Sequence, residues 1–197
     1  RFSYLFSSIA VIIGLSIFNI GYISIVDHIL QGDNLIQFQQ MINRQVLLMD
    51  KLLFNSDIKV VIFASISVLI TAPVAEEMLF RGFLLSPLES AMKKREAIAL
   101  SAGLFALIHM NLAIFPVIFV LGIILGYFAS YTKSIFPAIF IHFANNLLAY
   151  LNTQYLYKPD IKTLNEYELS LAGSVLFLVF GLFIIIYSII YLKNDEG

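Results

Sequence analysis

Two adjacent glutamates and an arginine stand inside a long apolar stretch of the sequence. Glu76 and Glu77 follow an apolar run, and Arg81 comes four residues after Glu77. An ionisable group inside a membrane span costs roughly 2.5–3.5 kcal/mol to insert, so such groups are candidate functional residues. Glu77 and Arg81 can pair on one helix face. A carboxylate in a dry site beside a like charge suits a general base, but spacing does not decide which glutamate takes that role.

Two histidines and an asparagine lie further along the chain, also within apolar stretches. His109 ends the pattern Phe105-x-x-x-His109, and His142 begins the pattern His142-x-x-x-Asn146. His142 and Asn146 are one helical turn apart, so both side chains can point at the same place. The structural alternatives are an interfacial histidine at 109 and an interhelical hydrogen bond from the second pair.

If these side chains converge, they support two kinds of hydrolytic chemistry. In the first, a glutamate deprotonates a water held beside His109, and His142 with the Asn146 amide donates hydrogen bonds to the oxyanion. In the second, Glu76, His109 and His142 bind a divalent metal such as zinc, because two His and one Glu form a catalytic zinc ligand set. The sequence lacks the His-Glu-x-x-His signature of zinc peptidases, and we favour a site without a cofactor.

Apolar segments of membrane-spanning length must position these residues. A helix needs about 20 mostly apolar residues to cross a bilayer. The sequence predicts an all-α polytopic membrane protein, a single membrane domain over 1–197 with six spans at about 4–26, 58–80, 97–112, 113–131, 134–156 and 169–192. We expect segment 27–57 to be a polar connection that includes an amphipathic interfacial helix, and 157–168 to be a polar loop.

The composition agrees with a chain whose solvent is largely lipid. Apolar residues make up 60% and charged residues 13%, and the net charge is −1, so nothing indicates a nucleic-acid partner. The absence of cysteine excludes disulfides and thiolate chemistry. The first residue is Arg rather than Met, so we expect further sequence upstream. Abundant Ile, Phe, Asn and Lys fit an AT-rich bacterial genome, which predicts the bacterial cytoplasmic membrane.

Basic residues predict the orientation. Lys93, Lys94 and Arg95 form the only basic cluster, which places their loop in the cytoplasm and segments 27–57 and 157–168 outside. Glu76 lies ~27 Å from the outer end of its predicted span and is therefore near the inner membrane surface. His109 lies ~20 Å from the basic loop and is therefore deeper in the membrane. Tilt, or a polar cavity entering from the cytoplasm, must therefore bring the candidate residues together.

A small-residue pair lies in the predicted fourth span. Gly122 and Gly126 form a Gly-x-x-x-Gly pattern. Such a pair lets two helix backbones approach closely in a membrane. We therefore expect a tight helix–helix contact there, which says nothing about chemistry.

Taken in order, the polar motifs resemble those of the CAAX-protease and bacteriocin-processing family, also called CPBP or Abi. The resemblance covers about residues 70–150 and rests on Glu76-Glu77-x-x-x-Arg81, Phe105-x-x-x-His109 and His142-x-x-x-Asn146. The family includes the type II CAAX prenyl endopeptidases. The resemblance implies an all-helical membrane fold, a cavity open to the cytoplasm and hydrolysis of a peptide bond.

The resemblance also implies a role for each motif. Glu76 would activate water together with His109, and Glu77 with Arg81 would support the site. The His142-x-x-x-Asn146 motif would form the oxyanion hole. Members are often described as metalloproteases, but the prenyl endopeptidases favour a metal-independent glutamate mechanism. The candidate catalytic residues are therefore Glu76, Glu77, Arg81, His109, His142 and Asn146.

The substrate and two competing functions stay open at this point. The bacterial composition favours a secreted peptide precursor or a small membrane protein over a prenylated protein. The first alternative is a non-catalytic immunity or partner-binding protein on the same scaffold. The second is a transporter with a polar relay, which predicts inverted repeats that the sequence does not show.

Overall fold

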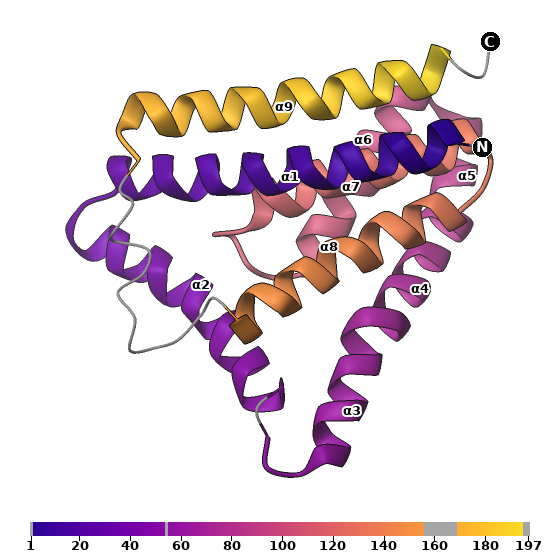
Figure 1. Ribbon diagram of the computed structural model, residues 1–197. Helices are drawn as coiled ribbons and strands as arrows, with labels where there is room; N and C mark the ends of the chain where they lie inside the picture. The colour runs from indigo at the N-terminus through magenta and orange to yellow at the C-terminus, as the bar shows by residue number, and fades with distance from the viewer. Residues whose placement is uncertain (1, 54, 156–168, 195–197) are drawn as a thin grey trace.

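Helices form nearly all of the protein in the computed structural model, which describes residues 2–53, 55–155 and 169–194. No strand occurs in those ranges, as the predicted all-α class requires, and the predicted loop 157–168 lies outside them. The helices are α1 (Phe2–Ile29), α2 (Gly32–Leu53), α3 (Ile58–Ile66), α4 (Ala72–Glu77), α5 (Leu85–Ala91), α6 (Lys94–Ile108), α7 (Phe115–Thr132), α8 (Phe136–Tyr155) and α9 (Leu171–Asn194). Figure 1 shows their arrangement.

The helices α3, α4 and α5 are parts of one long helix, which we call helix 58–91. Two π-helical segments, Ser67–Thr71 and Met78–Leu84, join its three α-helical parts. The predicted end near residue 80 was wrong, because the helix continues without a break to Ala91. Apolar residues continue beyond Arg81, and this residue is buried rather than placed at the membrane surface.

The corrected helix end brings two candidate residues to the same depth. Helix 58–91 and α6 are consecutive and joined by the short connection at Met92 and Lys93. Glu76 precedes the end of helix 58–91 by as many positions as His109 follows the start of α6. At a rise of about 1.5 Å per residue, each is ~22 Å from the connection. Phe80 and Phe105 are also equally far from the connection along their two helices, and their ring centroids are 5.2 Å apart.

Four helices among the described residues are long and apolar enough to cross a membrane, and the chain is an integral membrane protein. They are α1, helix 58–91, α7 and α9. Each of the six predicted apolar segments contains a helix, but α6 ends at Ile108, before the predicted end at 112, and α8 has a shorter apolar stretch, Phe136–Leu151. Helix α6 has 15 residues and is therefore ~22 Å long, less than a ~30 Å hydrocarbon core.

Small residues allow the closest helix contacts. Helices α1 and α9 lie side by side along one edge of the molecule (Figure 1), and a Cβ added at Gly181 would come within 2.5 Å of the Phe18 backbone nitrogen. The predicted contact of the Gly-x-x-x-Gly pair is also present. A Cβ at Gly122 would lie 2.9 Å from the Ala102 Cβ, so only glycine permits this spacing between α6 and α7.

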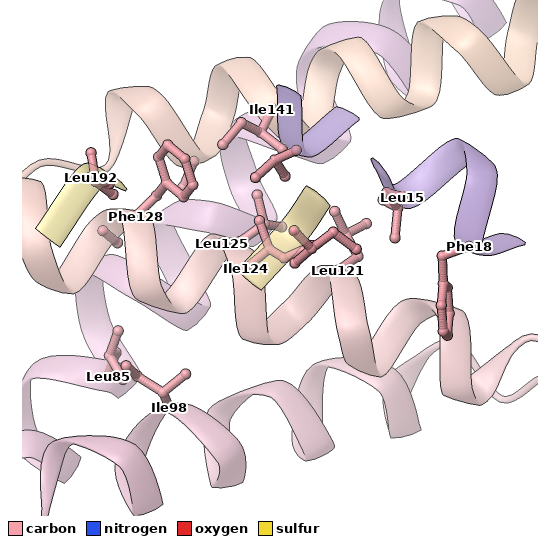
Figure 2. Packing of buried hydrophobic residues seen from close by; sticks show 14 of the residues in the cluster. Leu15, Phe18, Leu85, Ile98, Leu121, Ile124, Leu125, Phe128, Ile141 and Leu192 are labelled. Carbon is pink, nitrogen blue, oxygen red and sulfur yellow. The ribbon is translucent and has the colours of Figure 1, made fainter. Parts of the chain in front are cut away.

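The largest apolar cluster lies around α7. Figure 2 shows Ile124, Leu125 and Phe128 of α7 with side chains from the helices around them, among which are Leu15 of α1 and Ile141 of α8. Half of the residues of α7 are buried. The position of α7 at the centre fixes α6 and α8, which supply histidines to the candidate site.

The polar segment after α1 contains the expected helix. Helix α2 spans Gly32–Leu53 within the predicted 27–57 connection, and most of its described side chains are exposed. Phe38 is buried, and its ring packs edge-on against Tyr22 with centroids 6.5 Å apart. This contact holds α2 against the C-terminal part of α1.

Candidate active site

Pro73 explains the irregular backbone just before the two glutamates. In the first π-helical segment the Ala72 N–H donates to the Ser67 carbonyl, five residues back. The next donor in that register is Pro73, which has no N–H, so the Val68 carbonyl has no helical partner. Asn146 of α8 supplies one, because its Nδ2 donates to Val68 O at 3.0 Å. Proline and asparagine together therefore anchor α8 to the turn that precedes Glu76.

Glu77 joins a cation of its own helix to a histidine of α8. Its Oε1 accepts from Arg81 Nη1 at 2.9 Å and from His142 Nδ1, also at 2.9 Å. The side chains of Glu77 and Arg81 are fully buried, and only 4% of the His142 side chain is exposed. Because an ionised carboxylate only accepts, Nδ1 of His142 is the donor and its Nε2 points elsewhere. The predicted Glu77–Arg81 pair is thus present, with an additional partner.

Arg81 is held on three sides. Its Nη2 donates to the Gly122 carbonyl of α7 at 3.0 Å, and its Cζ lies 4.5 Å from the ring centroid of Phe105. A guanidinium over an aromatic face is attracted by the ring quadrupole. The close approach of α7 at Gly122 therefore also places the carbonyl that neutralises part of this buried cation.

Glu76 differs from its neighbour because it is partly accessible. Its side chain is 27% exposed, and its Oε2 lies 3.8 Å from Nε2 of His142. That separation is too long for a hydrogen bond, and Glu76 Oε2 is buried without a hydrogen-bond partner among the described residues. Both atoms therefore keep an unused hydrogen-bonding position, and a polar group that lies beside the two could bond to each of them.

His109 presents one nitrogen for further bonding. Helix α6 ends with its last turn tightened, because the His109 backbone N–H donates to Ala106 O rather than to Phe105 O. The Phe105 carbonyl instead accepts from Nδ1 of His109 at 2.8 Å. A carbonyl oxygen only accepts, so Nδ1 carries the proton and Nε2 of the neutral ring is an acceptor.

Phe105 connects the two halves of the site, and we did not foresee this role from the sequence. Its fully buried ring packs against the His109 ring, with centroids 4.8 Å apart, and against the His142 ring at 5.7 Å. The sequence marked Phe105 only as the start of a motif. Its spacing of four residues before His109 is the signal that could have indicated an aromatic contact on one helix face.

The structure therefore brings the predicted residues together in three ways. Glu76, Glu77, Arg81 and His142 form one connected group. His109 joins this group through Phe105. Asn146 lies one turn beyond His142 and bonds to the backbone of helix 58–91.

A polar cavity lies behind Arg81. It has a volume of about 210 Å³, and its lining includes Glu89, Ser130 and Lys133 as well as Arg81. Ser130 donates a hydrogen bond to Glu89 across it. Lys133 belongs to the connection between α7 and α8, which the basic-residue rule predicts to be cytoplasmic. The guanidinium of Arg81 separates it from Glu77 and His142.

Metal ligation was the alternative use of the same side chains. Across the described ranges, no three His, Asp or Glu side chains are grouped closely enough to hold a metal ion. The set Glu76, His109 and His142 therefore does not have ligand geometry in this structure. Nδ1 of His142 is bonded to Glu77, so only its Nε2 is open to another partner.

A comparison with protein-family models relates this chain to a known family. The model of the type II CAAX prenyl endopeptidase Rce1-like family matches residues 58–148, which extend from the start of helix 58–91 into α8. Over this segment, the chain is similar to the CAAX protease family. All the candidate site residues lie in the matched segment. No curated protein and no solved structure matches the chain.

Proposed function

We propose that this protein is an intramembrane endopeptidase of the CAAX protease family, with Glu76 as its general base. The observation that supports this role is the contrast between the two glutamates. Glu77 is fully buried, and its Oε1 accepts from Arg81 and His142, whereas the Glu76 side chain is 27% exposed and makes no hydrogen bond to either residue. A base must reach a water molecule, so the partly exposed carboxylate of Glu76 suits this task better than the fully buried carboxylate of Glu77.

Glu76 and His109 would hold the attacking water. The two residues are at equal depth from the α5–α6 connection, and Nε2 of His109 can accept one hydrogen of the water. Glu76 takes the other proton as the water oxygen bonds to the peptide carbonyl carbon. When the C–N bond breaks, the leaving amine receives this proton from Glu76, and the carboxylate is restored. The low dielectric around the site strengthens each of these interactions.

His142 would stabilise the oxyanion. Its Nδ1–H donates to Glu77, which fixes the ring orientation. With Nε2 also protonated, the second N–H is free to donate to the developing oxyanion. The Asn146 amide has two N–H groups, of which one bonds to Val68 O, so the other is available for the same oxygen.

The proposed substrate is a peptide precursor or a small membrane protein in a bacterial cytoplasmic membrane. A site ~22 Å from the basic connection is accessible to a segment that enters the membrane. The mechanism uses no metal, and Glu76, His109 and His142 act through proton transfer and hydrogen bonding.

The test compares peptides from cells that contain wild type or Glu76→Gln at matched abundance, by mass spectrometry of newly formed chain ends. We expect a defined product with wild type and with the control Glu96→Gln, because Glu96 is exposed in the first turn of α6. We expect none with Glu76→Gln. Identical products from a folded Glu76→Gln variant would instead favour the partner-binding alternative.

A further inference from the structure

An apolar groove lies between α7 and α9, away from the candidate active site. Its volume is about 390 Å³, and it is lined along its length by such residues as Val120, Leu182 and Ile185. Both lining helices are long and apolar enough to span the membrane. In a bilayer such a groove contains lipid or a partner, because it cannot remain empty of apolar atoms without loss of dispersion contacts.

One end of the groove is cationic. Arg95 and Lys193 line it together with the ring of Tyr131, and no acidic residue is among the lining residues that the structure describes. Lys94 lies next to this end, with its Nζ 4.3 Å from the Tyr131 ring centroid. Neither Arg95 nor Lys193 has an ion-pair partner among the described residues, whereas Lys93 pairs with Glu96. The charge of this end is complementary to an anion.

The length of the groove matches one leaflet. The lining extends from Val120 to Tyr131 on α7 and from Leu182 to Lys193 on α9, which is about three helical turns on each helix. Three turns correspond to ~17 Å, close to half of a ~30 Å hydrocarbon core. The cationic end therefore lies at headgroup level when the apolar part lies in the tails of the same leaflet, and Tyr131 occupies the level at which aromatic side chains favour the interface.

We propose that this groove is a binding site for a phospholipid with an anionic headgroup. One acyl chain lies along the apolar part, and the headgroup phosphate contacts Arg95 and Lys193. Clusters of basic residues at the ends of membrane helices bind anionic lipids in this way. Lys94, the third cation, contacts the Tyr131 ring and so helps to position this ring beside the headgroup. The site does not depend on the proposed peptidase activity.

The experiment measures retention and affinity of lipids by native mass spectrometry of the purified full chain, titrated with phosphatidylglycerol or phosphatidylcholine. Wild type and the control Lys59→Gln, whose cation lies at the opposite end of helix 58–91, should prefer phosphatidylglycerol. The double variant Arg95→Gln/Lys193→Gln should lose roughly 30-fold in affinity for phosphatidylglycerol and little for phosphatidylcholine.

A second variant tests the apolar part without any change of charge. Ile186→Trp fills the groove from an exposed position on α9 and should reduce binding of both lipids. Equal affinity of wild type for the two lipids, or undiminished phosphatidylglycerol binding by the double variant, would overturn the proposal. So would a dimer that the Ile186→Trp variant dissociates, because the groove would then hold a second copy of the chain.

Discussion

Glu77 is the residue on which the buried charges depend. It accepts from Arg81 and His142 while all three side chains are almost completely excluded from solvent. Removing one member of a buried pair leaves the other charge uncompensated, which costs more than the pair contributes. The stability of this buried group therefore depends on which charge loses its partner, rather than on the number of ion pairs in the protein.

A charge-removing variant at Arg81 tests this dependence. Arg81→Met keeps an apolar stem and leaves the Glu77 carboxylate buried without its cation, so we expect a loss of about 3–5 kcal/mol in the free energy of unfolding. Unfolding in detergent, followed by circular dichroism, measures the change. Lys93→Met is the control, because its pair with Glu96 is exposed and 4.0 Å long.

The effect of a second substitution on stability tests the same explanation further. Adding Glu77→Gln to Arg81→Met removes the uncompensated charge, so the double variant should be more stable than Arg81→Met alone. If the second substitution lowers stability further, the cost at Arg81 does not arise from a buried, unpaired carboxylate.

Helix 58–91 illustrates how much of an element can be predicted from sequence. Apolar content and the Glu77–Arg81 spacing correctly predict a helix and its internal ion pair. The helix end was misplaced because a run of charged residues is typical of a membrane surface, whereas here these charges neutralise each other inside the protein. A proline inside a helix indicates an irregular backbone, but the Asn146 contact at this site depends on α8, which is far from Val68 in the sequence.

A double-mutant cycle tests the interpretation of that irregularity. Asn146→Ala leaves the Val68 carbonyl without a donor, which should cost about 1–3 kcal/mol. Pro73→Ala restores an N–H that can donate to the backbone. In a Pro73→Ala background, Asn146→Ala should therefore cost clearly less, and the difference is the coupling energy. The free energy of unfolding is measured in detergent. If Asn146→Ala lowers it equally in both backgrounds, Asn146 does not replace the N–H that Pro73 lacks.

The contact between α6 and α7 gives a second prediction at the level of elements. Gly122→Val places a side chain where a Cβ would already be 3.0 Å from the Ala102 Cα, so the helices must separate, at a cost of about 1–3 kcal/mol. The separation also moves the carbonyl that accepts from Arg81. Gly82→Val is the matched control, since the nearest atom to a Cβ there is Glu77 O at 3.9 Å. Thermal unfolding should distinguish the two variants clearly.

At the scale of the whole molecule, the basic residues 93–95 predict the orientation in the membrane. The helix order and apolar lengths followed from composition, whereas the packing of α1 against α9 did not. Gly181 of α9 lies against the Phe18 backbone of α1, and no local sequence pattern indicates a contact between residues so far apart in the chain. The convergence of the site could be predicted only as a hypothesis, because it needed the true end of helix 58–91 and the ring of Phe105.

Single cysteines test the predicted orientation, since the chain contains none. Lys93→Cys should react with a membrane-impermeant maleimide only in inverted vesicles. Ser56→Cys, in the connection between α2 and α3, should react only in right-side-out vesicles. Both positions are exposed, so access depends on the side of the membrane rather than on burial. The reversed labelling pattern would show that the basic-residue rule fails for this protein.

Metal dependence is a further property of the whole molecule. Because the proposed mechanism assigns proton transfer to Glu76 and oxyanion stabilisation to His142, we expect the rate of product formation to be unchanged by prolonged treatment with EDTA or 1,10-phenanthroline. The control is the same treatment of a zinc peptidase in the same detergent. A loss of rate that added zinc restores would favour the metal alternative.

The most direct measurement of the central claim is the rate of peptide hydrolysis by purified wild type and Glu76→Gln in liposomes, with the substrate identified from cellular products. Loss of a general base lowers such rates by about 10²–10⁴-fold. We predict a loss of this size for Glu76→Gln, an unchanged midpoint of thermal unfolding, and a wild-type rate for Glu96→Gln. A wild-type rate for Glu76→Gln would contradict the account.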